Sequence, residues 1–288
     1  MNLATGFANQ LQFMKIDAHQ HFWHFDPVRD QWITDDMEVI RRDFLPADLK
    51  PVLDRNGIDG CIAVQAAQSE EENAFLLAHA AAHDFIKGVV GWVDLQAPDV
   101  EERLQHYQAF PKMKGFRHVL QGEVQRDFML RPAFQNGISL LHRYGFTYDI
   151  LIYPDQLPFI PTFVAVFPEQ KFIVDHMAKP YIRDKKIAEW KVYMQALAAY
   201  EQVYCKISGL VTEADWKRWT KADFTPYLDV VVQAFGIDRI VFGSDWPVCL
   251  VAAPYEAVLQ VATDYFSSYT QSEQAKFFGG NATRFYNL

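Results

Sequence analysis

Residues 16–27 read IDAHQHFWHFDP and place three histidines, two aspartates and a tryptophan within twelve residues. Histidine and carboxylate side chains bind metal ions and exchange protons near neutral pH, so this composition favours a reactive site. His19 and His21 are two residues apart, and side chains at that spacing in a strand point to the same face. The sequence therefore predicts two imidazoles that face one site.

Further titratable residues stand at the ends of later apolar runs. The motif GFRH contains Arg117 and His118, DHMAKP contains His176, and FGSDWPV contains Asp245. Neighbouring residues in a strand face opposite ways, so His118 is expected to point away from Arg117. For His118, a structural role and contact with a ligand are therefore equally compatible with the sequence.

The elements that must position these residues alternate along the chain. Eight apolar runs suit strands, at 13–23, 60–67, 87–95, 114–120, 146–153, 171–180, 203–211 and 239–248. An amphipathic segment with helical spacing follows each run, at 46–56, 70–83, 99–110, 131–145, 157–167, 188–201, 224–236 and 255–266. A last helical pattern lies within 271–288. The chain is thus predicted to contain eight strand–helix pairs and an additional C-terminal helix.

Strands that alternate with helices pair in parallel through right-handed crossovers, and eight such units favour closure into a (β/α)8 TIM barrel. The sequence has no GxGxxG or P-loop motif that would favour an open doubly wound sheet, and no linker divides it. We therefore expect one α/β barrel domain over residues 13–288, preceded by a tail at residues 1–12.

In such a barrel the carboxyl ends of all strands meet at one face, where active sites are built. His19 and His21 end the first strand, His176 ends the sixth and Asp245 ends the eighth. Chance placement of four titratable residues on that face is the less economical interpretation. These side chains are therefore predicted to converge.

Composition excludes several classes of partner. The 288 residues carry a net charge of −9 and contain no run of lysine and arginine, which argues against nucleic-acid and membrane-surface binding. The three cysteines are far apart in sequence, which favours reduced thiols and a cytoplasmic location. No stretch reaches the roughly 18 apolar residues of a membrane span. A homo-oligomer is compatible with the sequence.

Taken together, these motifs resemble the amidohydrolase superfamily. The similarity runs from Lys15 through nearly the whole chain and depends on DAHQH, on His176 in DHMAKP and on Asp245 in GSDWP. More narrowly, IDAHQHFW with Trp32, GFRH, KISGL and FGSDWPV resemble the branch of sugar-lactone hydrolases. The resemblance implies hydrolysis of an L-fucono-, L-rhamnono- or related aldonolactone to its sugar acid.

The same resemblance implies roles for the converging residues. His19, His21, His176 and Asp245 become candidate ligands of one divalent metal ion, with Zn²⁺ as the first choice. Asp245 is also the candidate general base, and His176 a ligand or acid. GFRH offers Arg117 where the family has a bridging lysine, and TYDILIY lacks a histidine, which argues against two metals.

A metal-free site is an open alternative. A carboxylate can deprotonate water that attacks an activated ester, provided that a cation or donor stabilises the oxyanion. Arg117 is the candidate donor.

A small-molecule sugar lactone is the expected partner. Aromatic rings offer apolar area to the C–H side of a sugar ring while polar neighbours bind its hydroxyls. The candidate substrate-binding residues are Trp23, Trp32, Gln65, His118, Tyr153 and Trp246. Gln65, Asp94 and Gln121 could bind substrate hydroxyls, and the roles of these three residues stay open.

Two other functions are compatible with the same motifs. One is a metal-dependent decarboxylase of an unsaturated carboxylic acid, because superfamily relatives use a similar HxH, His and Asp framework for that reaction. The other is a non-catalytic sugar-acid binding protein, although binding alone needs neither Asp245 nor the histidine pair.

Overall fold

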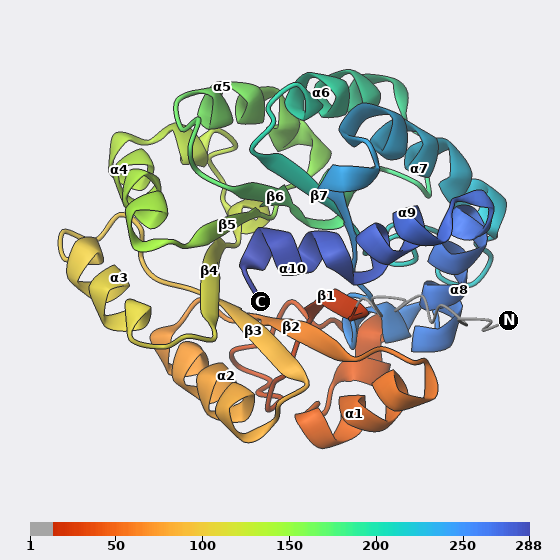
Figure 1. Cartoon of the computed structure of the whole chain (residues 1–288), viewed down its shortest axis with the longest axis horizontal. Coiled ribbons are helices and arrows are strands. Elements are labelled where there is room, and N and C mark those ends of the chain that lie inside the picture. The colour runs from red at the N-terminus through yellow and green to blue at the C-terminus, as the bar shows by residue number, and fades with distance from the viewer. Residues whose placement is uncertain (1–13) are drawn as a thin grey trace, which may run out of the picture.

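Eight parallel strands in chain order form the centre of the molecule (Figure 1). The computed structural model describes residues 14–288, so the predicted tail at residues 1–12 lies outside the described residues. The strands are β1 (Ile16–Gln20), β2 (Gly60–Val64), β3 (Ile86–Gly91), β4 (Met113–His118), β5 (Thr147–Ile150), β6 (Phe172–Val174), β7 (Val203–Ile207) and β8 (Ile240–Phe242). A parallel bridge between Gln20 and Trp246 brings the last strand unit back to the first. The predicted (β/α)8 barrel is confirmed.

A ring of helices surrounds the strands (Figure 1). They are α1 (Pro46–Arg55), α2 (Glu70–Ala82), α3 (Val100–Gln108), α4 (Pro132–Leu141), α5 (Ile160–Ala165), α6 (Ala188–Ala198), α7 (Lys221–Phe235) and α8 (Tyr255–Tyr265). The chain continues into α9 (Gln271–Ala275) and α10 (Asn281–Tyr286). The helix predicted over 157–167 is instead a 3-10 turn at Pro154–Phe159 followed by the short α5. Proline lacks an N–H group, so the prolines of this segment interrupt a continuous α-helical ladder.

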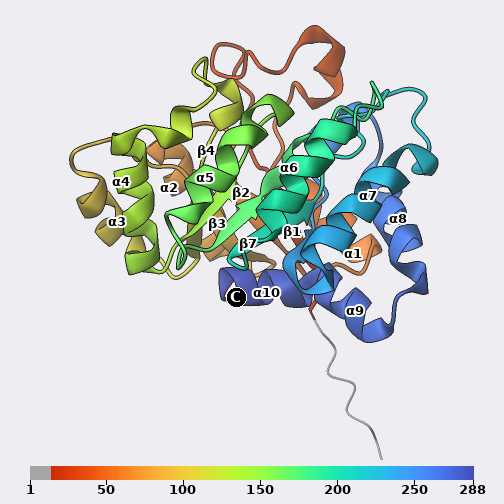
Figure 2. The same ribbon diagram turned by 90° about the horizontal axis from the view of Figure 1, so that it is seen from above.

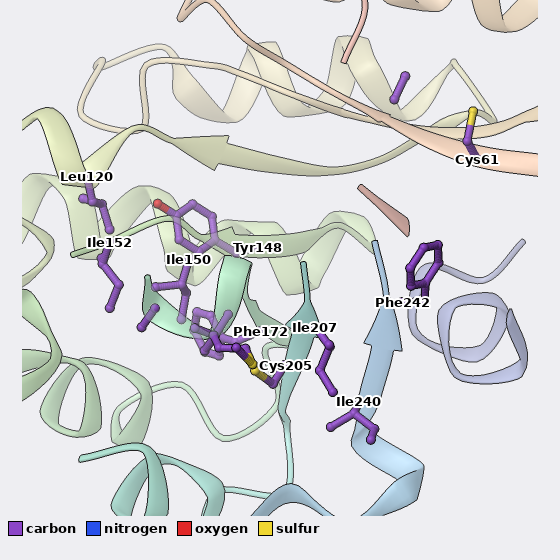
Figure 3. Packing of buried hydrophobic residues seen from close by; sticks show 14 of the residues in the cluster. Cys61, Leu120, Tyr148, Ile150, Ile152, Phe172, Cys205, Ile207, Ile240 and Phe242 are labelled. Carbon is purple, nitrogen blue, oxygen red and sulfur yellow. The ribbon is translucent and has the colours of Figure 1, made fainter. Parts of the chain in front are cut away.

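Side chains alternate along each strand between two apolar layers. Tyr148, Phe172, Cys205 and Ile207 belong to the outer layer, which lies between the strands and the helices (Figure 3). A smaller inner layer contains Ile16, Ala18, Ile62, Val64, Val90, Ile173 and Val241. Because neighbouring positions face opposite ways, Asp149 points inward between the outward-facing Tyr148 and Ile150.

The C-terminal helix closes one end of the barrel. Ala282, Phe285 and Tyr286 of α10 pack on the inner layer, and Asn281 Nδ2 donates to the Ile240 carbonyl at the amino end of β8. Helix α10 therefore covers the amino ends of the strands, and the segment between β1 and α1 lies at the opposite end (Figure 2). Only the carboxyl ends of the strands are left to form a site. None of the helices in residues 14–288 is long and apolar enough to span a membrane.

Candidate active site

A cavity of about 480 Å³ opens at the carboxyl ends of the strands. Seven of the residues predicted for the site line it, namely His21, Trp23, Trp32, Arg117, Tyr153, His176 and Asp245. Arg117 lies near the end of β4, and the loops after β1, β5, β6 and β8 carry the other six side chains. The structure therefore brings residues that are distant in sequence to one cavity.

Three imidazoles surround the Asp245 carboxylate. Asp245 Oδ1 lies 3.6 Å from His21 Nε2, 3.8 Å from His19 Nε2 and 3.9 Å from His176 Nε2. The Nε2 atoms of His19 and His21 are 3.2 Å apart. These separations place the predicted histidine pair and the predicted base around one point.

The orientation of His21 is fixed by the backbone of the next strand. Its Nδ1 lies 2.8 Å from the Val64 carbonyl oxygen. Since a carbonyl only accepts hydrogen bonds, Nδ1 carries the proton and Nε2 keeps its lone pair towards Asp245. This second hydrogen bond is the one that metal-binding histidines usually make.

His19 is fully buried behind His21. Its Nδ1 lies 3.3 Å from Asp175 Oδ1 and 3.1 Å from the ammonium of Lys206. Burial lowers the pKa of His19 well below its usual value, against the opposing effect of Asp175. The imidazole is therefore neutral at neutral pH.

His176 begins a left-handed turn after β6. Residues 176–179 all have positive φ, between 48° and 56°. The turn carries His176 into the cavity, where its Nδ1 lies 2.9 Å from Ser208 Oγ. Gly209 has a φ of +66°, and a Cβ there would lie 2.8 Å from His176 Nδ1. The KISGL motif thus provides both a partner and the room for this ring.

The loop after β8 is fixed to β1 by Asp17. Oδ1 of Asp17 accepts from the Ser244 N–H at 2.9 Å, and its Oδ2 accepts from the Tyr255 hydroxyl at 3.1 Å. The N–H of Asp245 donates to the His19 carbonyl at 2.9 Å. These contacts explain how the first and last strand units, far apart in sequence, hold His19 and Asp245 together.

A buried network of charges lies directly beneath the histidines. Lys206 Nζ lies 2.5 Å from Asp149 Oδ2 and 3.0 Å from Asp175 Oδ1. Arg117 Nη1 donates to Asp175 Oδ2 at 3.0 Å, and the Tyr286 hydroxyl donates to Asp149 at 3.0 Å. Two basic and two acidic side chains therefore balance one another on the barrel axis.

Burial sets the protonation of the site. It lowers the pKa of His176 to about 4, although Asp245 and Asp175 oppose the shift. Burial alone would raise the pKa of Asp245, but the neighbouring His176, His21 and His19 hold that pKa below its usual value. The carboxylate is therefore ionised and faces neutral imidazoles at neutral pH.

A comparison with protein families matches an amidohydrolase family model over residues 16–288. The chain belongs to this amidohydrolase family. It is 39% identical over 286 residues to an L-fucono-1,5-lactonase of Burkholderia multivorans, covering 96% of each chain. A second L-fucono-1,5-lactonase, from Burkholderia ambifaria, is 35% identical and covers 95% of this chain and 96% of its own.

A solved amidohydrolase structure with zinc bound has the same fold. It comes from Burkholderia multivorans, is 39% identical, covers 96% of this chain and 99% of its own, and superposes with a TM-score of 0.91. The amidohydrolase resemblance seen in the sequence is confirmed.

The donor set of this amidohydrolase fits a metal ion. One nitrogen each from His19 and His21 and one oxygen of Asp245 lie within 4.8 Å of one another. Among residues 14–288 no lysine or arginine lies within 4 Å of the Asp245 carboxylate. A buried carboxylate without a cation is costly, and two neutral imidazoles with one carboxylate are ligands that Zn²⁺ accepts.

A second donor group, His19, Asp175 and His176, has similar spacing. Its carboxylate is already paired with Arg117 and Lys206, each at 3.0 Å. Fixed cations therefore occupy the surroundings in which a second metal would have to bind.

Three predicted substrate-binding residues do not line the cavity. Gln65 is buried, and its Nε2 donates to the Arg117 carbonyl. His118 stacks on Phe128 outside the barrel wall, as the alternation of β4 requires. The indole of Trp246 packs edge-on against Phe44, with ring centres 5.2 Å apart.

Besides Gln65, two residues whose roles stayed open are separated from each other in the structure. Gln121 lines the cavity, whereas Asp94 is exposed and caps the N–H of Gln96.

Several cavity residues of this amidohydrolase were not predicted as site residues. They are Met37, Ala66, Val119, Gly122, Leu151, Lys179, Thr212, Glu213, Trp216, Val248 and Val251. Lys179 lies in DHMAKP and Val248 lies in FGSDWPV, but neither was predicted as a site residue. The other residues come from loops whose path the apolar periodicity does not determine.

Proposed function

We propose that this amidohydrolase hydrolyses a sugar lactone, L-fucono-1,5-lactone or a related aldonolactone, to its sugar acid. The observation that carries the proposal is the ionised Asp245 among three neutral imidazoles at the cavity. The proposal is supported by the similarity to two L-fucono-1,5-lactonases, which are 39% and 35% identical to this chain over nearly its full length. A cavity of about 480 Å³ is of the size that holds small molecules.

Hydrolysis requires addition of water to the lactone carbonyl and protonation of the ring oxygen that leaves. Asp245 accepts a proton from the attacking water, since its carboxylate is ionised at neutral pH. The same proton then returns to the leaving alkoxide, with the neutral His176 beside Asp245 as the relay. The products are one carboxylic acid and one hydroxyl group on the same chain.

Arg117 can stabilise the negative charge that develops on the lactone carbonyl oxygen. Its Nη1 holds Asp175, and its Nη2 donates to the Gln65 carbonyl. The buried Nε has no hydrogen-bond partner in residues 14–288. Because Arg117 also lines the cavity, its guanidinium is the candidate donor to a developing oxyanion.

One divalent ion, with Zn²⁺ as first choice, would be held by His19, His21 and Asp245. His176 is a further candidate ligand, since its Nε2 lies 3.9 Å from Asp245 Oδ1. Such an ion would lower the pKa of a bound water molecule to about 7 and would polarise the lactone carbonyl. An Asp245 carboxylate of low pKa is a weak base, so acidification of the water suits this residue. Metal-free hydrolysis is the alternative, and activity that chelation leaves unchanged would favour it.

The two alternative functions are not favoured. The relatives at 35% and 39% identity are lactonases, whereas a decarboxylase releases carbon dioxide without adding water. A binding protein would need no ionised carboxylate among the imidazoles. Cytoplasmic location, a homo-oligomer and the lack of nucleic-acid or membrane partners stay predictions from the sequence.

Replacement of Asp245 tests the proposal. Lactone turnover is followed by acid release with a pH indicator, using L-fucono-1,5-lactone and L-rhamnonolactone as substrates. Asp245→Asn should reduce kcat at least about a hundredfold, because the amide cannot accept the proton. Asp94→Asn, an exposed aspartate at the same end of the barrel, is the matched control. Near-normal turnover by Asp245→Asn would refute the assignment.

A further inference from the structure

A lysine–glutamate pair lies on the cavity wall and is not used by the hydrolytic residues. Lys179 follows β6 and Glu213 follows β7, and both line the cavity. Lys179 Nζ and Glu213 Oε1 are 3.6 Å apart, and the side chains are 17% and 20% exposed. At this separation the ion pair is too long for a good hydrogen bond. Both groups therefore keep donors and acceptors for a ligand.

The backbone that presents Lys179 is unfavourable for its residues. His176, Met177, Ala178 and Lys179 all have positive φ, a conformation that L-residues other than glycine avoid. The turn is held by the Lys179 N–H, which donates to the His176 carbonyl at 2.8 Å. Trp190 Nε1 adds a bond to the Met177 carbonyl at 2.7 Å. One turn therefore brings a reaction-centre imidazole and an ammonium to the same cavity.

Gln121 adds an acceptor to the lining. It belongs to the 3-10 turn Leu120–Gly122 after β4 and lines the cavity. Its Oε1 is buried and has no partner in residues 14–288. A buried acceptor without a donor is costly, so a hydroxyl from a bound molecule would relieve this cost.

The three side chains match the chemistry of a polyol. A hydroxyl both donates and accepts, so it can donate to Glu213 or Gln121 and accept from Lys179. Trp216 and Tyr153 also line the cavity and offer apolar area to the C–H face of a ring. A purely structural ion pair would not need to line the cavity, as Lys179 and Glu213 do.

We propose that Lys179, Glu213 and Gln121 form a hydroxyl-binding subsite that selects polyhydroxylated lactones over lactones with an unsubstituted ring. The inference rests on the proposed lactonase function and adds the residues that recognise the substrate hydroxyls. Its consequence is that binding through the hydroxyls, rather than the carbonyl chemistry, separates sugar lactones from simple ones.

The test compares kcat/KM for L-fucono-1,5-lactone with kcat/KM for δ-valerolactone, which has a six-membered ring without hydroxyls. Lys179→Met and Glu213→Gln should each lower the ratio of the two values at least about tenfold, mainly through KM for the sugar lactone. Lys186→Met is the matched control, because Lys186 pairs at 3.3 Å with Asp184 in the same loop but is 69% exposed. Its ratio should stay within about twofold of wild type.

The outcomes separate this inference from the proposed function. If wild type hydrolyses the sugar lactone but the variants keep the wild-type ratio, the subsite is refuted and the lactonase function stands. If both substrates lose the same factor, the pair is structural and the subsite is likewise refuted. If wild type hydrolyses no sugar lactone, both proposals fail. Glu213→Gln preserves side-chain shape, so it gives the answer even if Lys179→Met does not fold.

Discussion

Replacement of Lys206 by methionine is the sharpest test of the charge network on the barrel axis. Lys206 is fully buried, and its ammonium lies between Asp149 and Asp175 at 2.5 and 3.0 Å. Methionine keeps most of the volume of the lysine stem and removes only the charge. The variant leaves Asp175 with Arg117 and leaves Asp149 with the Tyr286 hydroxyl alone.

The expected loss follows from the unpaired carboxylate. Breaking a buried ion pair by removing one partner costs about 3–5 kcal/mol. Burial raises the pKa of Asp149 to about 6 even beside Lys206, whose charge opposes the shift. Without Lys206 this pKa rises further, so Asp149 takes up a proton. The loss of unfolding free energy then lies near the lower end of the range of about 3–5 kcal/mol. We therefore expect the free energy of unfolding to fall by about 3 kcal/mol, which corresponds to a fall in Tm on the order of 10 °C.

The direction in which the stability loss changes with pH tests whether the unpaired Asp149 carboxylate causes it. A carboxyl group whose folded-state pKa is raised stabilises the fold at low pH and loses that contribution as pH rises through the folded-state value. The free-energy gap between wild type and Lys206→Met should therefore be smaller at pH 5 than at pH 8. Urea unfolding at both pH values measures it.

Two further variants complete the design. Lys50→Met removes an exposed pair with Asp54 and should cost no more than about 0.5 kcal/mol. Asp149→Asn in the Lys206→Met background should recover part of the loss, because it removes the unpaired charge. A Lys206→Met protein that is as stable as wild type at pH 8 would refute the argument that this ammonium balances the buried aspartates.

Three other predictions follow from the site. Gly209→Ala should reduce kcat tenfold or more, since a Cβ at φ +66° would lie 2.8 Å from His176 Nδ1, and steady-state kinetics measures it. Tyr286→Phe removes the hydroxyl that donates to Asp149 at 3.0 Å and should lower the free energy of unfolding by about 1–3 kcal/mol in urea titrations. Dialysed wild type should bind about one Zn²⁺ per chain by elemental analysis, and His21→Ala should bind at least tenfold more weakly.

The barrel could be predicted from the sequence because its signals are local. Alternation of apolar runs with amphipathic segments identifies strands and helices residue by residue, and the carboxyl-end rule then collects His19, His21, His176 and Asp245. These inferences need no knowledge of how loops are shaped. For His118, period-two alternation in β4 left two roles open, and its prediction as a substrate-binding residue was wrong, because its ring stacks on Phe128 away from the cavity.

The rest of the site depends on contacts between distant segments. Trp246 adjoins Asp245 in sequence, yet its indole packs on Phe44 because the loop after β8 turns at Asp245, where φ is 60°. Glu213 lies in none of the sequence motifs, and it reaches the cavity only because the loop after β7 passes beside the turn at Lys179. Such positions are set by tertiary packing rather than by periodicity.

The distribution of charge in the core supports the proposal of a single metal ion. Asp149 and Asp175 already face two fixed cations, so a second dication near Asp175 would meet Lys206 and Arg117 at close range. Asp245 differs, because its neighbours in residues 14–288 are imidazoles that burial keeps neutral. The Asp245 carboxylate therefore has no fixed cation beside it, and a divalent ion bound there would balance its charge.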